Sequence, residues 1–226
     1  MKKKVLVLLT NHATLGEDGE KNGTYLAELT HAVEEFNKSD IGYDFVSING
    51  GEAPIYGHED NDNLDPMNEK YLNNEEFMSK LNNTHKASDI NSADYDAVFY
   101  PGGYGLLYDL AKNKEVAEIT KKLYENNKTV AAVCHGPAGL LPIVLSNGKS
   151  ILDGRHVTGF TREEEVAFGT IDKIPYLLEE SLVEKAHKYS KLEATKEHVI
   201  VDGHLITGQN PMSAGAVGKA IVKQLQ

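Results

Sequence analysis

The stretch that decides the fold reads TVAAVCHGPAGLL and spans residues 129–141. Its first five residues form an unbroken run of apolar and β-branched side chains, which is typical of a strand covered on both faces in a parallel sheet. Cys134 follows directly, and Gly136 and Pro137 then favour a tight turn into a helix near residues 138–145. A strand, a sharp turn and a helix are the arrangement of a nucleophile elbow, which exposes the side chain at the turn for reaction.

The rest of the chain repeats this alternation. Apolar runs predict strands at residues 4–10, 43–48, 95–100 and 156–160, and helical spacing of apolar residues predicts helices at 22–36, 106–111, 116–126 and 176–189. Asp202 and Gly203 separate two apolar runs within residues 199–207 and predict a type I′ β-hairpin, and a last helix is expected over 213–226. Together these elements predict an α/β fold with a mostly parallel sheet and right-handed crossovers.

Residues 52–92 interrupt this pattern. They are polar and rich in Asn and Asp, and only Leu72, Phe77 and Leu81 suggest a helix there. We interpret the segment as an insertion in a single domain that spans residues 1–226. The acidic stretch at residues 58–65 lacks the glycine and glutamate that a calcium loop requires at its sixth and twelfth positions, so no calcium site is predicted there.

Charge and cysteine content narrow the classes of function. A net charge of −11 disfavours both a nucleic-acid partner and docking on anionic membranes. A single cysteine cannot form an intrachain disulfide or a cysteine zinc cluster, and no His-Glu-x-x-His motif occurs, so we expect no metal and no cofactor. The apolar run near the N-terminus is too short for a signal peptide and no run could span a bilayer, so we expect a cytoplasmic protein.

Cys134 is the candidate nucleophile. The N-terminus of the expected helix would favour an anion and lower the pKa of the thiol, and the thiolate is the reactive form. His135 suits proton transfer at neutral pH, although side chains of adjacent residues diverge and the sequence does not place its imidazole against the sulfur. The amides of His135 and of Gly103, in the turn PGGYG after strand 95–100, are candidate donors to a substrate oxyanion. The alternative is a buried cysteine that merely tolerates a tight turn.

One single carboxylate and one run of three are further candidates for the active site. Glu28 lies in the middle of the predicted helix on its apolar side, where burial would raise its pKa and let it donate a proton to a neighbouring group. The alternative is a solvated helix glutamate. Glu163, Glu164 and Glu165 follow the strand that ends at Phe160, and three adjacent carboxylates favour a solvated helix start. At most one of the three is expected to point inward.

These motifs resemble those of the PfpI/DJ superfamily. The resemblance rests on AAVCHGPAGLL, PGGYG, VTGFTREEE and DGHLITGQNPMSA, and it covers nearly the whole chain apart from residues 52–92, where it is weakest. It implies a class I glutamine amidotransferase-like domain, which is a flavodoxin-like three-layer α/β/α sandwich. The segment NGTYLAEL and the long insertion are most similar to the glyoxalase III and heat-shock-chaperone branch.

The resemblance also implies an activity and roles for single residues. Members of that branch convert methylglyoxal to lactate without glutathione or metal, and some are reported as protein deglycases or holding chaperones. By position in the motifs, Cys134 would be the nucleophile, His135 its histidine, Glu28 the helix carboxyl and Glu165 the carboxylate that orients the histidine. A homodimer is implied as well, with unfolded or glycated proteins as further clients.

Three other functions fit parts of the sequence. A cysteine peptidase or amidohydrolase needs an open cleft, whereas the insertion is expected to cover the site and favour small substrates. A redox-sensitive holding chaperone would use an oxidisable thiol beside Glu28 and an apolar surface patch. A flavodoxin-like cofactor-binding protein is disfavoured because the glycine turn lacks phosphate-cradle spacing. We rank the glyoxalase first, the chaperone second and the peptidase third.

Overall fold

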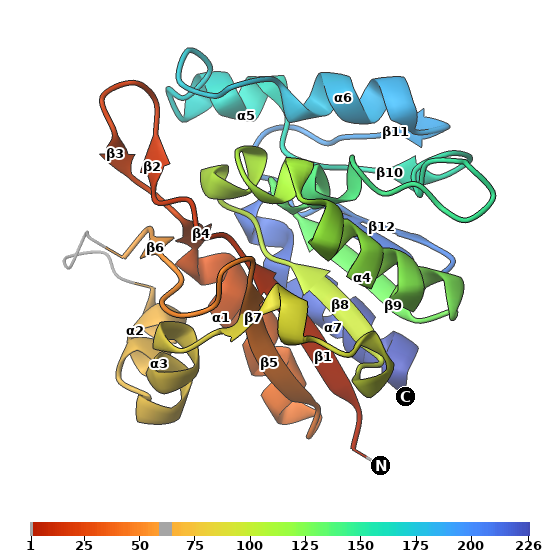
Figure 1. Cartoon of the computed structure of the whole chain (residues 1–226). Coiled ribbons are helices and arrows are strands. Elements are labelled where there is room, and N and C mark those ends of the chain that lie inside the picture. Colours follow the sequence, from red (N-terminus) through yellow and green to blue (C-terminus); the bar gives the residue numbers. More distant parts are fainter. Residues whose placement is uncertain (1, 59–64) are drawn as a thin grey trace.

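The computed structural model describes residues 2–58 and 65–226 of the chain. Its main sheet has the strand order β12-β13-β9-β8-β1-β5-β7. These strands are β1 (Lys4–Leu9), β5 (Gly42–Ser47), β7 (His85–Lys86), β8 (Ala97–Tyr100), β9 (Thr129–Val133), β12 (Val199–Asp202) and β13 (Leu205–Gly208). All neighbouring strands are parallel except β12 and β13, which form the predicted hairpin. The predicted α/β class with a mostly parallel sheet is confirmed (Figure 1).

Helices cover both faces of this sheet and make three layers. One face carries α1 (Leu26–Lys38) and α7 (Ala214–Leu225), and the other carries α4 (Lys114–Glu125) (Figure 1). Successive residues of β1 and β9 are buried alternately against the two layers, which is why their sequences read as continuous apolar runs. Full burial of one Leu or Phe side chain stabilises such a core by about 1.5–3 kcal/mol.

Several predicted elements are shorter or of another kind. Cys134 is followed by the 3₁₀ helix η5 (Gly136–Leu140) and not by an α-helix to residue 145, since Gly136, Pro137 and Gly139 are poor helix formers. The strand predicted at 156–160 is only β10 (His156–Val157), which pairs with β11 (Lys188–Tyr189) outside the main sheet. The helix predicted at 176–189 is α6 (Leu178–Lys185). The remaining 3₁₀ turns are η1 (Ala87–Asp89), η2 (Ser92–Asp94), η3 (Tyr104–Leu107), η4 (Leu110–Lys112) and η6 (Pro211–Ser213).

The described part of residues 52–92 holds two α-helices where the sequence predicted one. They are α2 (Pro66–Leu72) and α3 (Glu75–Asn82), and each begins at a side-chain cap. Asp65 accepts a hydrogen bond from the amide of Met67 at 2.8 Å, and Asn74 accepts one from the amide of Phe77 at 2.9 Å. Such caps can start a short helix whose apolar periodicity is weak. Most of the acidic stretch at residues 58–65 lies outside the described residues.

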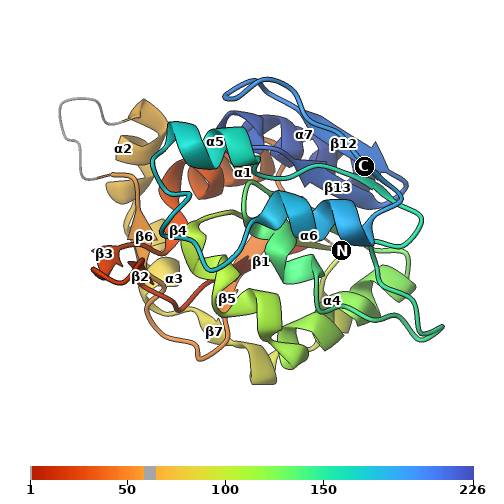
Figure 2. The same cartoon turned by 90° about the horizontal axis from the view of Figure 1, so that it is seen from above.

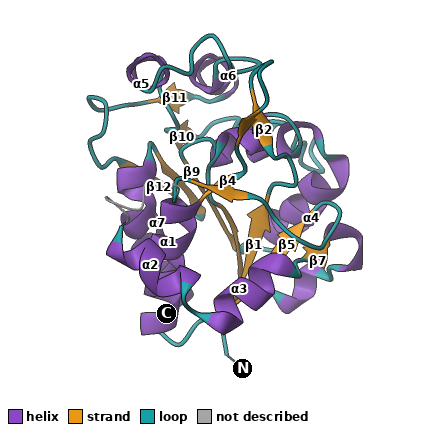
Figure 3. Ribbon diagram, turned by 90° about the vertical axis from the view of Figure 1, so that its left-hand side faces the viewer, coloured by secondary structure: helices purple, strands orange, loops and turns teal. Residues whose placement is uncertain are grey.

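Short elements surround the carboxyl ends of the parallel strands. Seen from above, α5 (Arg162–Ala167) and α6 lie over this edge of the sheet (Figure 2), and Figure 3 shows them with β10 and β11 above the central layers. Two small ribbons flank the same edge: β2 (Thr14–Leu15) with β3 (Glu20–Lys21), and β4 (Thr24–Tyr25) with β6 (Ile55–Tyr56). No helix in the described part of the chain is long and apolar enough to cross a membrane.

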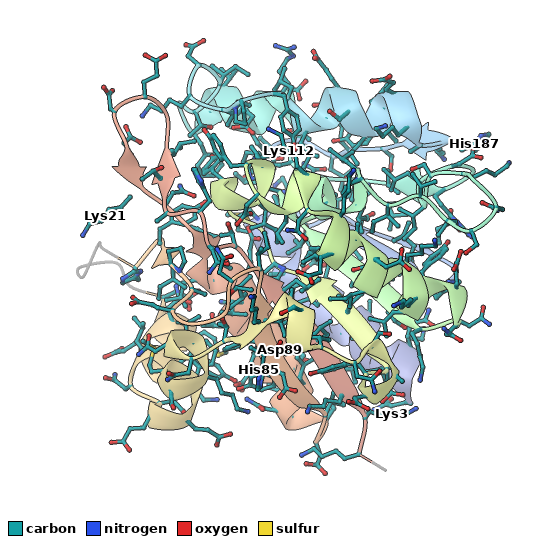
Figure 4. The ribbon with its side chains drawn as sticks, in the orientation of Figure 1. Lys3, Lys21, His85, Asp89, Lys112 and His187 are labelled. Carbon is teal, nitrogen blue, oxygen red and sulfur yellow. The ribbon has the colours of Figure 1, made fainter. Side chains whose placement is uncertain are left out.

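Most ionic side chains lie on the outside of the layers. Figure 4 labels six exposed ones: Lys3, Lys21, His85, Asp89, Lys112 and His187. Among the described residues, the acidic and basic side chains that are buried are Glu28, His135, Glu164 and Glu165. Burying a charge is costly unless it is paired or well hydrogen-bonded, so this group needs a structural or chemical explanation.

Candidate active site

Cys134 lies at the sharp turn between β9 and η5. Its φ is +59°, in the left-handed region that residues other than glycine rarely adopt. Strain of this kind costs on the order of 1–3 kcal/mol and persists where the surrounding structure holds it. Here the Cys134 amide donates to the carbonyl of Gly208, and the amide of Phe160 donates to the Cys134 carbonyl, each at 2.9 Å. The sharp turn predicted from the sequence is therefore present.

His135 lies between the sulfur of Cys134 and the carboxyl group of Glu165. Its Nδ1 is 3.4 Å from Sγ, and its Nε2 is 2.7 Å from Oε1 of Glu165. The rings of Tyr104 and Phe160 flank the imidazole, with 4.5 Å between ring centroids in both cases. The unusual backbone at Cys134 turns two adjacent side chains toward each other, which sequence spacing could not reveal. The structure thus brings the predicted Cys, His and Glu together in one hydrogen-bonded chain.

Glu164 and Glu165 both point inward, so the expectation of at most one buried carboxylate was wrong. Only Glu163 remains at the surface, where it pairs with Lys191. A capping box between Thr161 and Glu164 starts α5 and fixes the direction of the next side chain. The other Glu164 oxygen accepts hydrogen bonds from the amide of Thr195 and the side chains of Gln209 and Asn210. Two adjacent carboxylates are tolerated because each one meets several donors.

Replacement of Glu164 by glutamine is expected to destabilise the fold by about 3 kcal/mol. The substitution turns one acceptor oxygen into a donor, so buried N–H groups that point at Glu164 lose their acceptor. Urea unfolding at neutral pH measures the effect. Glu163→Gln is the matched control, because it changes the same side chain one residue earlier at the surface, and it should stay within about 0.5 kcal/mol. Equal losses in the two variants would contradict the anchoring role of Glu164.

Glu28 lies in the first turn of α1 and not in the middle of a helix, because α1 begins at Leu26. The side chain is buried, and its Oε2 accepts a hydrogen bond from the amide of Gly102 at 2.5 Å. Burial raises the pKa of Glu28 to about 8, although hydrogen bonds with the Cys134 thiol and the Gly102 amide offset part of the rise. Glu28 therefore keeps its proton at pH 7 and lies beside the sulfur as an acid.

The pKa of the Cys134 thiol moves opposite to the predicted direction. Burial raises it well above its ordinary value, and the nearby carboxylates of Glu28, Glu164 and Glu165 raise it further. The expected stabilisation by an α-helix N-terminus is missing because a five-residue 3₁₀ turn follows the cysteine. A thiol of this kind needs a base within reach, and Nδ1 of His135 is placed to take its proton.

Two buried backbone amides, just past the carboxyl ends of two adjacent strands, have no acceptor among the described residues. They belong to Gly103 and His135, which follow the neighbouring strands β8 and β9. Gly103 has a φ of +124°, and a Cβ atom there would lie 2.2 Å from the carbonyl oxygen of Gly23, so only glycine fits. Buried amides are normally paired. These two are therefore available to a ligand oxygen, as an oxyanion site requires.

A small cavity of about 60 Å³ opens at the sulfur. Besides Glu28, Cys134 and His135, it is lined by Tyr25, Tyr56, Tyr104, Phe160, Phe168 and Pro211. Tyr56 lies within residues 52–92, the segment interpreted as an insertion, and forms part of the wall. Sequence reasoning missed these aromatic residues because they come from separate loops and share no spacing pattern. In the described part of the chain, no group of three or more His, Cys, Asp or Glu side chains could hold a metal ion.

Comparisons with known proteins identify the family of the chain and several of its relatives. Residues 20–224 match the family model described as the DJ-1/PfpI family. The chain is 33% identical to the glutathione-independent glyoxalase HSP31 of Saccharomyces cerevisiae, over 94% of this chain and 93% of that protein. It is 31% identical to Glyoxalase 3 of Candida albicans, over 97% of each.

Two solved structures are similar to this chain over nearly its whole length. The chain is similar to the rapid encystment protein of Francisella tularensis, with a TM-score of 0.92, 36% identity and 99% of each chain covered. It is also similar to the crystal structure of glyoxalase III from Candida albicans, with a TM-score of 0.86, 28% identity, and 98% of this chain and 97% of that chain covered. The resemblance noted in the sequence is therefore confirmed.

Proposed function

The chain belongs to the DJ-1/PfpI family, and we propose that it is a glutathione-independent glyoxalase that converts methylglyoxal to lactate with Cys134 as its nucleophile. One observation carries the proposal: Cys134, His135 and Glu165 form a continuous hydrogen-bonded chain at the wall of a small cavity. Relatives at about 30% identity over most of the chain bear the same activity in their names, which supports it.

His135 begins the reaction as a base. Its Nε2–H donates to Glu165, which leaves Nδ1 to accept the thiol proton. Sγ of Cys134 then bonds to the aldehyde carbon of the dicarbonyl, and the C=O electron pair moves onto the oxygen. The free amides of Gly103 and His135 hold that oxyanion until the imidazolium returns the proton. The product of this half is a hemithioacetal on Cys134.

The second half is an internal redox step. C1 loses its carbon-bound proton and C2 gains one through an enediol, and the C1 hydroxyl proton passes to the C2 oxygen, so that C1 is oxidised and C2 is reduced without an external oxidant. Because Glu28 has a pKa of about 8 and keeps its proton at pH 7, we assign it to protonate C2, and His135 to take the proton from C1. The resulting thioester reacts with water, activated by His135, to release lactate and the free thiol. Proton exchange with solvent restores both side chains.

The cavity also favours a small substrate over a polypeptide. Its volume of about 60 Å³ accommodates a few water-sized molecules. The rings of Tyr25, Tyr56 and Tyr104 line it beside the sulfur, and an extended peptide needs an open groove at the nucleophile. The geometry therefore supports a glyoxalase more strongly than a cysteine peptidase.

The proposal is tested by incubating the purified protein with methylglyoxal in the absence of glutathione and in the presence of a metal chelator. Lactate should form in proportion to protein concentration, while casein in a parallel assay should remain intact. Absence of lactate from a folded protein with a titratable thiol would overturn the proposed activity, and casein cleavage would favour the peptidase instead.

Replacement of Glu28 should change stability in a pH-dependent way. The pKa of Glu28 is about 8 in the fold, against an ordinary value of 4.5 that the unfolded chain keeps. Between these two values the unfolded chain has released a proton that the folded protein still holds, so stability falls as pH rises. The loss reaches at most roughly 5 kcal/mol above pH 8. Glu28→Gln removes this titration, so its stability relative to the unsubstituted protein should increase between pH 5 and pH 9.

Urea unfolding of both proteins at pH 5, 7 and 9 measures that difference. The exposed Glu115 on α4 offers a control, because Glu115→Gln should follow the pH dependence of the unsubstituted protein. A difference between the Glu28→Gln and unsubstituted proteins that stays constant from pH 5 to 9 would show that Glu28 does not hold a proton at neutral pH.

We further propose that the protein is a cytoplasmic homodimer, and that unfolded or glycated proteins are additional clients. The family resemblance supports the homodimer and the clients, and a net charge of −11, which disfavours docking on anionic membranes, fits a cytoplasmic location. The small dicarbonyl remains the main substrate, because the buried acid–base chain around Cys134 serves no purpose in holding an unfolded protein.

A further inference from the structure

The hydrogen-bonded chain does not end at Glu165. Oε2 of Glu165 accepts a hydrogen bond from the hydroxyl of Thr170 at 2.5 Å, and this hydroxyl accepts one from Tyr104 at 3.0 Å. Thr170 follows α5, and its amide donates to the carbonyl of Glu165 at 2.9 Å. Thr170 therefore contacts Glu165 through both its backbone and its side chain, and all three residues are buried.

For a neutral imidazole and an ionised carboxylate, the donors and acceptors along this chain permit one arrangement of protons. The buried hydroxyl of Tyr104 keeps its hydrogen, because desolvation raises its pKa far above neutral, and it donates to Thr170. Thr170 then gives its single hydrogen to Glu165, whose Oε2 at 2.5 Å is closer than its carbonyl oxygen at 3.2 Å. Glu165 accepts the Nε2–H of His135 at its other oxygen, so Nδ1 presents its lone pair to Cys134.

Tyr104 connects this chain to the substrate cavity. Its ring lines the cavity at the sulfur and lies 4.5 Å from the imidazole of His135, measured between ring centroids. Its hydroxyl reaches the far end of the chain at Thr170. A single side chain thus contacts both the space for the substrate and the last group that supports Glu165.

We propose that Thr170 is a positioning residue for the nucleophile, which, supported by Tyr104, fixes the carboxylate of Glu165 so that His135 faces Cys134 in the proton-accepting tautomer. The terminal torsion of a glutamate has a broad energy minimum, so a carboxylate held at only one oxygen can rotate. Thr170 holds the second oxygen and removes that freedom. The place of Thr170 in catalysis rests on the proposed function, whereas its effect on the thiol does not.

Two substitutions at Thr170 separate the hydroxyl from the shape of the side chain. Thr170→Val keeps the shape and removes the donor, and Thr170→Ser keeps the donor. The readout is the rate at which iodoacetamide alkylates Cys134 between pH 5.5 and 9, which reports on proton removal from the only thiol of the chain. Thr170→Val should slow alkylation at pH 7 by about tenfold or more and move the midpoint of the rate profile to higher pH, while Thr170→Ser stays within about threefold.

Lactate formation provides a second readout. Thr170 does not line the cavity, so Thr170→Val should lower kcat by a factor similar to that for alkylation and leave KM nearly unchanged. Tyr104→Phe keeps the ring against His135 and removes only the hydroxyl that supports Thr170. Tyr104→Phe should also slow alkylation, by a smaller factor than Thr170→Val. It replaces Thr170→Val as the test variant if that protein does not fold.

Thr120→Val is the matched control. It breaks another buried pair of tyrosine and threonine hydroxyls, those of Tyr100 and of Thr120 on α4, which lie 2.5 Å apart and make no hydrogen bond with Glu165. This variant should lose stability and alkylate at the unsubstituted rate. If a folded Thr170→Val protein keeps the unsubstituted rate and pH midpoint, or is slowed no more than Thr120→Val, the positioning role is refuted.

The same measurements separate this inference from the proposed activity. A protein that forms no lactate, but whose thiol is slowed by Thr170→Val and rescued by Thr170→Ser, supports the positioning role and contradicts the glyoxalase. If the unsubstituted protein and Thr170→Val form lactate at the same rate, the result supports the glyoxalase and contradicts the positioning role.

Discussion

Cys134→Ala is expected to lower the rate of lactate formation from methylglyoxal by about four orders of magnitude or more. The reaction proposed above proceeds through a covalent bond to Sγ, and neither His135 nor Glu28 can replace the sulfur as the atom that carries the substrate. Cys134→Ser should lose nearly as much, because a hydroxyl gives up its proton far less readily than a thiol. Initial rates of lactate release without glutathione measure the loss.

The fold should survive this substitution. Alanine is smaller than cysteine, and the backbone at this turn is held by the carbonyl of Gly208 and the amide of Phe160, which the substitution leaves in place. Circular dichroism and the midpoint of thermal unfolding therefore serve as controls, and iodoacetamide labelling should disappear because the chain has a single cysteine. Lactate release by Cys134→Ala at the rate of the unsubstituted protein would refute the covalent mechanism.

The parallel strands could be predicted because burial on both faces requires apolar side chains at consecutive positions. Each of β1, β8 and β9 is covered by helices on both sides, so each reads as a continuous apolar run. The turn at Cys134 was predictable for a related reason, since glycine and proline directly after a buried strand restrict the backbone. The candidate site lies at the carboxyl ends of β8 and β9, where parallel sheets place their functional crevices.

Side-chain contacts within the site were not predictable, because they depend on how distant segments meet. Glu164 looked like a surface residue among three carboxylates, and only the folded chain brings Gln209 and Asn210 against it. The pKa of Cys134 was predicted in the wrong direction because local sequence shows the turn but not the burial of the thiol or the three carboxylates around it. Local pattern therefore predicted where the chemistry lies, and tertiary contacts decide the protonation states.

Glu165→Gln is the second substitution with a large expected effect, a loss of roughly 10³–10⁴ in kcat. The amide can adopt two orientations, and both disturb the chain. If its oxygen faces His135, its NH₂ group meets the Thr170 hydroxyl, whose hydrogen must leave its acceptor at 2.5 Å and turn to the carbonyl oxygen of residue 165 at 3.2 Å. If its NH₂ group faces His135, Nε2 must become the acceptor and the ring proton moves to Nδ1. Nδ1 can then no longer take the thiol proton of Cys134.

The second orientation is favoured because the Thr170 hydroxyl keeps its side-chain acceptor at 2.5 Å and does not have to turn to the longer contact of 3.2 Å with the backbone carbonyl. The loss should therefore appear in kcat and in the rate of iodoacetamide alkylation together, since both need proton removal from Sγ. Glu163→Gln, an identical change at the surface two residues earlier, should leave both rates unchanged. A Glu165→Gln protein that alkylates and turns over within tenfold of the unsubstituted rate would mean that the imidazole accepts the thiol proton without an oriented carboxylate, and the chain from Tyr104 to Cys134 would then be structural only.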